Sequence, residues 1–257
     1  MLTTKELKLW LRSGSLRFAL DSRKTTSQSP RIASVEWNKY PVHYRVGTSD
    51  VGVIHSILLR KGNKAEYFIP RSIQPRTIFD IGGNIGCAAL YFAHTYSSAR
   101  VFSFEPIPCN FTLLEKNIAP YRNIQAFNIA LGLDNETLQL IESPDCHNLG
   151  GFSIYQRGAT SKCSRVPVTC RNIAEFIHEL DVIPDLIKVD TEGAEFLILT
   201  ALPEEVITRV HWIIGELHGE NDFELLAHLS KWFEIGIRKS VNGPLCNFQA
   251  RNRTLVP

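Results

Sequence analysis

From Thr77 onward, short apolar runs alternate with longer amphipathic segments. The apolar runs are rich in β-branched and aromatic residues, and they predict strands at 77–81, 100–104, 123–128, 185–190 and 211–216. The segments between and after them predict helices at 85–96, 108–119, 171–180, 193–201 and 222–232. Because this alternation is typical of a parallel sheet with helices on both faces, we predict an α/β fold. The last residues, 234–252, predict two strands joined through Asn242-Gly243-Pro244, a hairpin at the edge of the sheet.

The residues before Thr77 follow a different pattern. They predict an amphipathic helix, a polar linker, a hairpin and a second helix, over 1–20, 21–30, 34–46 and 47–62 in turn. Ser49 or Asp50 is the expected N-cap of that second helix. We therefore expect an N-terminal extension, 1–70, that covers the site of the main domain, 71–257. Within the main domain, residues 142–168 show no clear period, and we interpret them as a lid-like insertion.

Composition and charge exclude several classes of protein. The chain has 257 residues, 44% of them hydrophobic and 21% charged, which is ordinary for a globular protein. Its net charge of +2, from 28 basic and 26 acidic residues, gives no reason to expect a nucleic-acid partner. No apolar run approaches the length of a membrane span, and the N-terminus does not resemble a secretory signal, so we expect a cytoplasmic protein without a membrane partner. The oligomeric state stays open.

The cysteines are scattered without any C-x-x-C pair, which favours reduced thiols. A zinc site could in principle gather Cys146, His147, Cys163 and Cys170, but their spacing matches no compact zinc pattern. We do not expect zinc there.

A glycine-rich turn follows the first of the predicted parallel strands, in the stretch TIFDIGGNIG over 77–86. It is not a P-loop, because Gly86 is followed by Cys-Ala-Ala where that loop carries lysine and a hydroxyl. It is also tighter than the G-x-G-x-x-G turn of dinucleotide sites, and Asp80 at the strand end would repel a pyrophosphate unless it faced away. A carboxylate suits a ligand with a cationic amino group and no phosphate, and S-adenosylmethionine has that chemistry. We expect Asp80 to engage its ammonium group, directly or through water.

A second acid, Glu105, ends the next predicted strand. An acid at that position can accept hydrogen bonds from both hydroxyls of a ribose. NAD sites also use an acid there, so Glu105 alone does not separate the two cofactors. A tight connection or a solvated strand end would explain Asp80 or Glu105 alone, but both in register on successive strands favour S-adenosylmethionine.

The stretch DLIKVDTEGAEFLIL, 185–199, predicts the fourth strand of the parallel set. The strand carries Lys188 in its middle and ends at Asp190, and Glu192 lies in the turn that follows. In an open α/β sheet, the carboxyl ends of the first and fourth strands flank the ligand crevice. Asp190 and Glu192 are therefore expected near the reacting group, and Lys188 is expected to be a paired or snorkelling residue.

Together these segments resemble the FkbM family of S-adenosylmethionine-dependent methyltransferases. The resemblance runs from about residue 45 to 220 through six segments: GTSDVGVIHSIL, TIFDIGGNIGCAALYFA, VFSFEPIPCNFTLLEKNI, NIALG, DLIKVDTEGAEFLIL and WIIGELHG. It implies the Rossmann-like class I methyltransferase fold, a seven-stranded sheet whose last strand is antiparallel. It also implies methyl transfer, usually to a hydroxyl of a small molecule, often a secondary metabolite or a sugar.

The resemblance also assigns residues of this chain. Those that match the cofactor site are Asp80, Gly82, Asn84 and Gly86 in the loop, and Glu105 with the adjacent Pro106. Gly83 is in the same loop, where the family more often has alanine, a change we expect to be tolerated. Asp190, Glu192 and Gly193 match the signature after the fourth strand, and Asp190 is also a cofactor-binding candidate. Asn128 is a weaker candidate for the neighbourhood of the adenine.

Transfer to an alcohol requires a base close to the acceptor oxygen. We favour Asp190 and Glu192 with His218, because the fourth and fifth strands end beside the same crevice. A structural role for His218 is an equally good interpretation. A divalent cation is possible but not favoured, and its ligands would be Asp190, Glu216 and His218.

Three functions stay in competition. The leading hypothesis is a small-molecule O-methyltransferase that uses S-adenosylmethionine. The second is an NAD-dependent oxidoreductase, against which the tight turn speaks. The third is a non-catalytic S-adenosylmethionine-binding protein.

Overall fold

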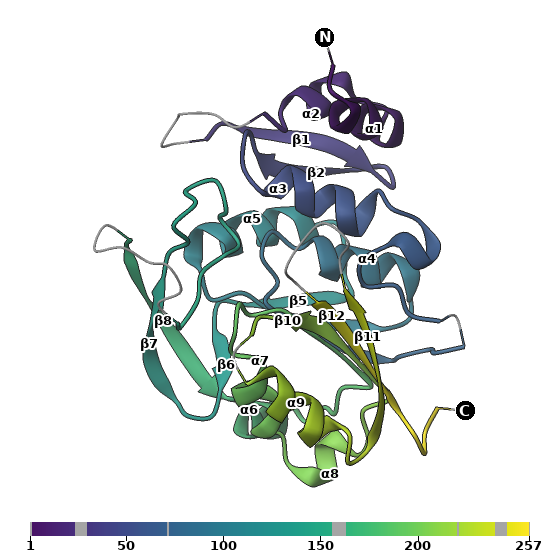
Figure 1. The fold of residues 1–257 in the computed structure, drawn as a ribbon, viewed down its shortest axis with the longest axis vertical. Coiled ribbons are helices and arrows are strands. Elements are labelled where there is room, and N and C mark those ends of the chain that lie inside the picture. The colour runs from purple at the N-terminus through teal and green to yellow at the C-terminus, as the bar shows by residue number, and fades with distance from the viewer. Residues whose placement is uncertain are drawn as a thin grey trace.

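The computed structural model describes residues 2–23, 30–70, 72–155, 163–219, 221–239 and 246–256. Its centre is a seven-stranded sheet with the order β11-β12-β10-β9-β3-β4-β5 (Figure 1). The strands are β3 (Thr77–Ile81), β4 (Arg100–Phe104), β5 (Ile124–Phe127), β9 (Leu186–Val189), β10 (Trp212–Leu217), β11 (Phe233–Lys239) and β12 (Cys246–Asn252). All neighbours are parallel except β12, which is antiparallel to both β10 and β11. The predicted fold and its C-terminal hairpin are confirmed, while the Asn242–Pro244 turn lies outside the described residues.

Helices cover both faces of this sheet, each with its own hydrophobic core. The helices are α4 (Cys87–Thr95), α5 (Pro108–Ile118), α6 (Ile173–Leu180), α7 (Glu195–Thr200), α8 (Glu204–Ile207) and α9 (Asp222–Leu229). Along β3, Ile78 joins the core on the side of α4 and α5, and its neighbour Phe79 joins the core on the side of α6 to α9. This alternation follows from the two-residue period of a strand, and it explains why β3 is buried along its whole length.

The N-terminal residues pack on the α4–α5 side. They form α1 (Thr4–Ser13), α2 (Leu16–Leu20), the antiparallel pair β1 (Ile32–Trp37) and β2 (Tyr40–Arg45), α3 (Asp50–Val53), the π-helix η1 (Ile54–Leu58) and the 3₁₀-helix η2 (Gly62–Lys64). Leu9, Phe18 and Val42 belong to the same core cluster as Leu90 of α4 and Leu114 of α5. The extension therefore shares its core with the main domain.

The expected long helix at 47–62 is shorter and less regular than predicted. Ser49 occupies the N-cap of α3 but makes no capping bond through its side chain. The buried Asp50 instead accepts from Arg45, with 2.8 Å between Nε and Oδ2. Within the described residues, no helix is long and apolar enough to cross a membrane.

A second, three-stranded sheet lies beside the main one (Figure 1). It has the order β6-β8-β7 and consists of β6 (Ala130–Gly132), β7 (Glu136–Ile141) and β8 (Arg165–Asn172). The last residues of the segment 142–168, interpreted as an insertion without a clear period, belong to a strand, because β8 begins at Arg165 and pairs with both β6 and β7. The predicted helix start at 171 also moves to Ile173, because β8 continues to Asn172. Residues 156–162 lie outside the described part.

Candidate active site

A cavity of about 320 Å³ opens where β3, β4, β9 and β10 end. Its volume lies in the range typical of small-molecule sites, roughly 300–1,000 Å³. Carboxyl ends of parallel strands are the usual ligand position in such sheets. The expected site residues that line the cavity are Gly82, Asn84, Glu105, Pro106, Asp190 and Glu192. The N-terminal residues contribute Ser49, Val53 and Glu66, and the insertion contributes Asn148, Gly150, Phe152 and Ile154.

The loop after β3 needs its first glycine for two reasons. Gly82 has φ +81°, and a Cβ there would collide with the carbonyl oxygen of Asp190. The N–H groups of the loop already have acceptors within the protein. Those of Gly82 and Gly83 both donate to the Phe104 carbonyl, at 3.0 and 2.8 Å. The Asn84 N–H donates to Glu105 at 2.7 Å, and the Gly86 N–H to the Gly83 carbonyl at 2.8 Å. These four N–H groups are not available to a ligand.

Asp80 lies beneath this loop and not in the cavity wall. It pairs directly with Ser103 of β4 and Lys188 of β9 in the strand register, so all three side chains are on the same face of the sheet. Asp80 is fully buried, accepts from the Ser103 hydroxyl at 2.8 Å and lies 3.2 Å from Lys188 Nζ. The structure therefore differs from the expected direct contact with an ammonium group, because both carboxylate oxygens face partners inside the sheet.

Lys188 joins this buried acid to the glycine loop. Its ammonium donates to the carbonyl oxygens of Ile81 and Gly82, at 3.2 and 2.5 Å. Burial alone would lower its pKa, but the charges of Asp80 and Asp190 raise it above the ordinary value for lysine. The expectation of a paired residue is confirmed, and the partners show that Lys188 holds the loop in place.

Glu105 stands at the cavity wall, at the end of β4. One of its oxygens accepts from Asn84 N–H, and the other accepts from Ile107 N–H at 2.9 Å. Burial raises the pKa of Glu105 to about 6, against the opposite effect of these hydrogen bonds. The oxygen that faces Ile107 also accepts from the Asn110 amide at 3.4 Å. The oxygen that faces Asn84 has a further lone pair, so Glu105 can still accept from a hydroxyl donor in the cavity.

On the other side of the cavity, Asp190 follows β9 directly and Glu192 lies in the turn after it. The Tyr67 hydroxyl donates to Asp190 Oδ2 at 2.9 Å, so a residue of the N-terminal extension holds this carboxylate. Glu192 has φ +55°, a left-handed conformation that is costly for a residue with a side chain. The Ser153 hydroxyl of the insertion donates to its carbonyl at 2.6 Å. Strain of this kind is typical of functional positions.

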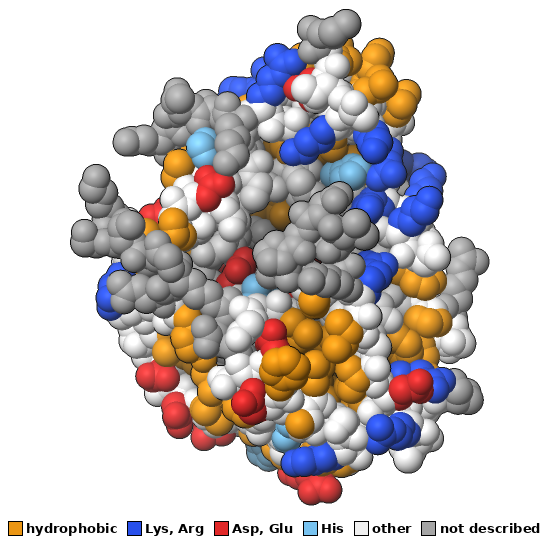
Figure 2. Space-filling view, viewed as in Figure 1, with side chains coloured by type: hydrophobic (Ala, Val, Ile, Leu, Met, Phe, Trp, Pro, Cys, Tyr) orange, Lys and Arg blue, Asp and Glu red, His pale blue; other side chains and the backbone are white. Residues whose placement is uncertain are grey.

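His218 is behind these carboxylates and just after β10. Its Nδ1 lies 3.0 Å from Oε1 of the buried Glu195. Its Nε2 is buried and faces Glu192, Glu216 and Asp190, whose nearest oxygens are 3.6, 3.7 and 3.8 Å away. Burial alone would lower the pKa of His218, but Glu195 and the other carboxylates raise it, while burial and the Asp190 charge raise the pKa of Glu216. On the face drawn in Figure 2, acidic and histidine atoms are seen together in a hollow near the middle.

Besides Asp80, the expected residues that do not line the cavity are Gly83, Gly86, Asn128, Gly193 and His218. Gly86 instead begins α4 in a left-handed conformation, with φ +89°. A Cβ at Gly83 would collide with Ser103 Oγ and lie 2.8 Å from Leu114 Cδ1, so the expected tolerance of alanine is not supported in this chain. Asn128 donates to the carbonyls of Glu105 and Pro106, at 2.8 and 3.1 Å, and thereby holds the end of β4.

Sequence reasoning missed three kinds of site residue. The first kind positions other site residues: Tyr67 contacts Asp190, and Glu195 contacts His218. Only the folded chain brings these pairs together. Glu66 lines the cavity from the extension without any motif of its own. The third kind is an apolar wall that includes Leu138 and Leu140, whose alternation along β7 was a readable strand signal.

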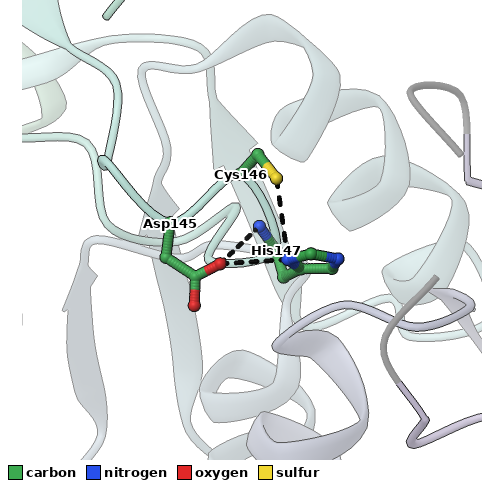
Figure 3. Close-up of side chains that lie close together, drawn as sticks. All are labelled: Asp145, Cys146 and His147. Carbon is green, nitrogen blue, oxygen red and sulfur yellow. Dashed lines mark hydrogen bonds and ion pairs between the residues drawn. The ribbon is translucent and has the colours of Figure 1, made fainter. Parts of the chain in front are cut away.

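A second group of ligand-type side chains lies on the surface, in the loop between β7 and β8 (Figure 3). It consists of the consecutive residues Asp145, Cys146 and His147, with His147 Nδ1 3.0 Å from Asp145 Oδ1 and 3.6 Å from Cys146 Sγ. Among the described residues, neither Cys163 nor Cys170 joins such a group.

A doubly covered sheet with an acid- and glycine-lined cavity at its strand ends is typical of α/β proteins that bind a small-molecule ligand there. Comparison of the sequence with protein families is more specific: the Methyltransferase FkbM domain matches residues 80–239. The chain therefore belongs to the FkbM methyltransferase family, and the predicted resemblance is confirmed.

The chain is similar to named methyltransferases and to solved structures of low sequence identity. The chain is 26% identical over 185 residues to Methyltransferase 1 of Beauveria bassiana, which covers 63% of this chain and 74% of that protein. It is 29% identical over 167 residues to Methyltransferase sdnD of Sordaria araneosa, which covers 52% of this chain and 61% of that protein. Among solved structures, M. capricolum TrmK in complex with S-adenosylhomocysteine is similar over 69% of this chain and 62% of its own, with 11% identity and a TM-score of 0.41.

Proposed function

We propose that this methyltransferase uses S-adenosylmethionine and transfers the methyl group to a hydroxyl of a small molecule, such as a secondary metabolite or a sugar. The hydroxyl acceptor follows from the family resemblance, and the cofactor follows from the residues around the cavity. The observation that carries the cofactor assignment is the hydrogen bonding of the glycine loop.

The loop suits a ligand without phosphate. A dinucleotide site binds pyrophosphate through free N–H groups of its glycine turn and of the following helix. In this chain Gly82, Gly83, Asn84 and Gly86 all direct their N–H groups to oxygens of the protein. Glu105, at the same wall, can accept from the ribose hydroxyls that both cofactors carry, so the occupied N–H groups are what distinguishes the two ligands. This supports S-adenosylmethionine over the NAD alternative.

The cofactor fits the donors and acceptors that are present. Glu105 would accept from the ribose hydroxyls, and the acids Asp190 and Glu66 offer acceptors for the ammonium group, the role first expected of Asp80. The apolar wall from Ile129 to Leu140 is the candidate for the adenine. Bound there, S-adenosylmethionine supplies an electrophilic methyl group on a sulfonium.

Asp190 and Glu192 are the proposed bases. Both line the cavity and can take the proton that an acceptor hydroxyl loses, provided that the oxygen lies within hydrogen-bond reach of about 2.6–3.2 Å. The buried His218 does not line the cavity, so we propose that it acts through these carboxylates and not on the acceptor itself.

Calorimetric titrations with S-adenosylhomocysteine and with NAD, in parallel, test this proposal. We expect micromolar binding of S-adenosylhomocysteine, no heat from NAD, and release of S-adenosylhomocysteine when S-adenosylmethionine is supplied with an accepted alcohol. Binding of NAD alone by the folded protein would reject the proposal in favour of the oxidoreductase. Binding of S-adenosylhomocysteine without turnover on a broad panel of alcohols, amines and carbon acids would favour the non-catalytic alternative.

A further inference from the structure

The ends of β9 and β10 gather more acceptors than donors. Asp190, Glu216 and His218 each offer a ligand atom, and these atoms all lie within 4.8 Å of one another. Glu192 adds a further carboxylate oxygen, 3.6 Å from His218 Nε2. These residues come from a strand end, a turn and the neighbouring strand, so the folded sheet and not a local turn brings them together.

His218 directs an unpartnered nitrogen into this group. Its Nε2 is buried and has no hydrogen-bond partner, while its side chain is only 3% exposed. Its other nitrogen faces Glu195, whose Oε1 also accepts from the N–H groups of Thr191 and Gly193, at 2.8 and 3.3 Å. A carboxylate fixed in this way keeps the proton on Nδ1, so Nε2 is the nitrogen that can release its proton and bind a cation. Carboxylate–histidine pairs of this kind commonly orient metal-binding imidazoles.

The distances favour an ion over a proton in the middle of the group. The three carboxylate oxygens are 3.6–3.8 Å from Nε2, beyond the roughly 2.7–3.2 Å of an N–H···O hydrogen bond. Two ligand atoms about 2.1 Å from one ion are roughly 3.0–3.6 Å apart when they subtend about 90–120°. A small contraction of the group would therefore complete a coordination shell.

The remaining oxygens of two acids are already occupied by neutral donors. Asp190 Oδ2 accepts from the Tyr67 hydroxyl, and Glu216 Oε1 accepts from the Asn247 amide at 3.1 Å. These bonds orient Asp190 Oδ1 and Glu216 Oε2 toward His218 and supply no positive charge. The nearby cation, Lys188, is committed to Asp80 and to the loop carbonyls. The group therefore has excess negative charge, and a cation that binds it takes the place of a proton on His218 Nε2.

We propose that Asp190, Glu216 and His218, with Glu192 beside them, bind a divalent cation at the floor of the cavity. One imidazole with carboxylates suits a first-row ion such as Mn²⁺ or Zn²⁺ better than Ca²⁺, which takes oxygen ligands only. Asp190, Glu192 and Glu216 line the cavity, so an acceptor hydroxyl could approach the ion from the open side. On the proposed methyltransferase function, the ion would lower the pKa of that hydroxyl.

The surface group of Asp145, Cys146 and His147 provides a matched control. It offers a carboxylate, a thiol and an imidazole, but from three consecutive loop residues that are partly or fully exposed. The experiment is a titration of the chelator-treated, cofactor-free protein with Mn²⁺, followed by calorimetry and by the electron paramagnetic resonance signal of the free ion. It compares the wild type with His218→Ala, Glu216→Gln and His147→Ala.

We expect one Mn²⁺ per chain, bound about tenfold or more weakly by His218→Ala and by Glu216→Gln, and unchanged by His147→Ala. The proposal is overturned if the wild type binds no Mn²⁺, or if both site variants bind it as the wild type does. If His218→Ala does not fold, the nearly isosteric Glu216→Gln decides alone. Titration of the same samples with S-adenosylhomocysteine separates the two proposals: Mn²⁺ binding without cofactor binding rejects the methyltransferase mechanism and leaves the cation site.

Discussion

At the β3–β4 end of the cavity, Asp80 and Glu105 are held by fixed donors, whereas at the β9–β10 end Asp190 and Glu216 face an unpartnered histidine nitrogen. In the first pair, Ser103 and backbone N–H groups donate hydrogen bonds, and the charge of Lys188 lies 3.2 Å from Asp80 Oδ1, which has no hydrogen bond of its own. The second pair shares its space with His218 and Glu192 and carries excess negative charge. The difference teaches that the position of an acid at a strand end does not define its role. The hydrogen-bond donors around it indicate whether it has a structural role or is available to a ligand, a proton or a cation.

The largest effect is expected at the β9–β10 end. In the double variant Asp190→Asn, Glu192→Gln, the acceptor hydroxyl loses its proposed bases, so kcat should fall by about 10²–10⁴-fold. Affinity for S-adenosylhomocysteine should fall less, because the variant changes only one of the two proposed acceptors for its ammonium group, Asp190, and leaves Glu66, Glu105 and the glycine loop untouched. Steady-state kinetics and calorimetry measure the two quantities, with Asp145→Asn in the surface loop as the control. An equal loss in both would mean that this end of the cavity binds the cofactor and does not provide the base.

The β3–β4 end should respond through stability. In Lys188→Met, the buried Asp80 carboxylate loses its ionic partner and the Ile81 and Gly82 carbonyls lose their donor. Breaking a buried ion pair on one side costs about 3–5 kcal/mol, which denaturant unfolding would detect. Lys116→Met, at an exposed position of α5, is the control. A loss no larger than that of the control would show that the pair does not hold the loop.

Glu105→Gln tests whether the β3–β4 end of the cavity binds the cofactor while the β9–β10 end binds the cation. The amide keeps the size of the side chain but loses the charge that attracts hydroxyl donors, and hydrogen bonds to a charged group contribute about 1.5–3 kcal/mol. Affinity for S-adenosylhomocysteine should therefore fall by roughly 100-fold. Affinity for Mn²⁺ should not change. Glu115→Gln, exposed on α5, controls for the loss of one negative charge. The comparison between the two ends fails if Glu105→Gln weakens Mn²⁺ binding and spares the cofactor.

Glu195→Gln tests the orientation of His218. The carboxylate fixes the imidazole tautomer, and the loss of such a partner typically lowers metal affinity by about 10–100-fold. The hydrogen bond with His218 also lowers the pKa of Glu195 despite its burial, so the group is ionised at neutral pH. Mn²⁺ titration measures the effect against Glu224→Gln, exposed on α9. Unchanged affinity would mean that Glu195 has only a packing role.

The smallest effect is a pH dependence at Glu105. Burial raises the pKa of this carboxyl to about 6 in the free protein, and ribose hydroxyls that donate to it favour the ionised form, so binding lowers the pKa. Affinity for S-adenosylhomocysteine is then full above pH 6 and is lost as the pH falls through that value, by roughly tenfold at pH 5. Lys188 is the charged neighbour that opposes the shift, and its ammonium does not titrate in this window. Calorimetry between pH 5 and 8 should give a flat profile for Glu105→Gln, and a flat wild-type profile would contradict the assignment.

The main sheet was predictable because its strands are buried on both faces and are therefore continuously apolar, as at Thr77–Ile81. The small sheet was missed because β8 pairs with β6 and β7 across the 142–164 segment, and pairing between distant residues leaves little local signal. Glu105 was recognised as a cavity acid from its place at a strand end. The inward direction of Asp80 depends on its cross-strand neighbours Ser103 and Lys188, which only the register reveals.

The β9–β10 end was predictable as a set of residue types but not as an arrangement. The positions of Asp190, Glu192, Glu216 and His218 near strand ends placed them at the same edge of the sheet. The role of Glu195 could not be predicted, because its partner His218 is 23 residues away in the sequence. The two residues meet only where the start of α7 lies beside the end of β10. The sequence alone therefore did not favour a cation, whereas the unpartnered nitrogen does.

The most direct test of the different roles of the β3–β4 and β9–β10 ends is one crystal structure of the protein with S-adenosylhomocysteine and Mn²⁺. The anomalous signal of Mn²⁺ would locate the ion. We expect the ribose hydroxyls on Glu105 beside the glycine loop, and a single anomalous peak between His218 Nε2 and the carboxylates of Asp190 and Glu216. A ribose bound away from Glu105, or a peak at the Asp145–His147 loop with none at His218, would contradict the account.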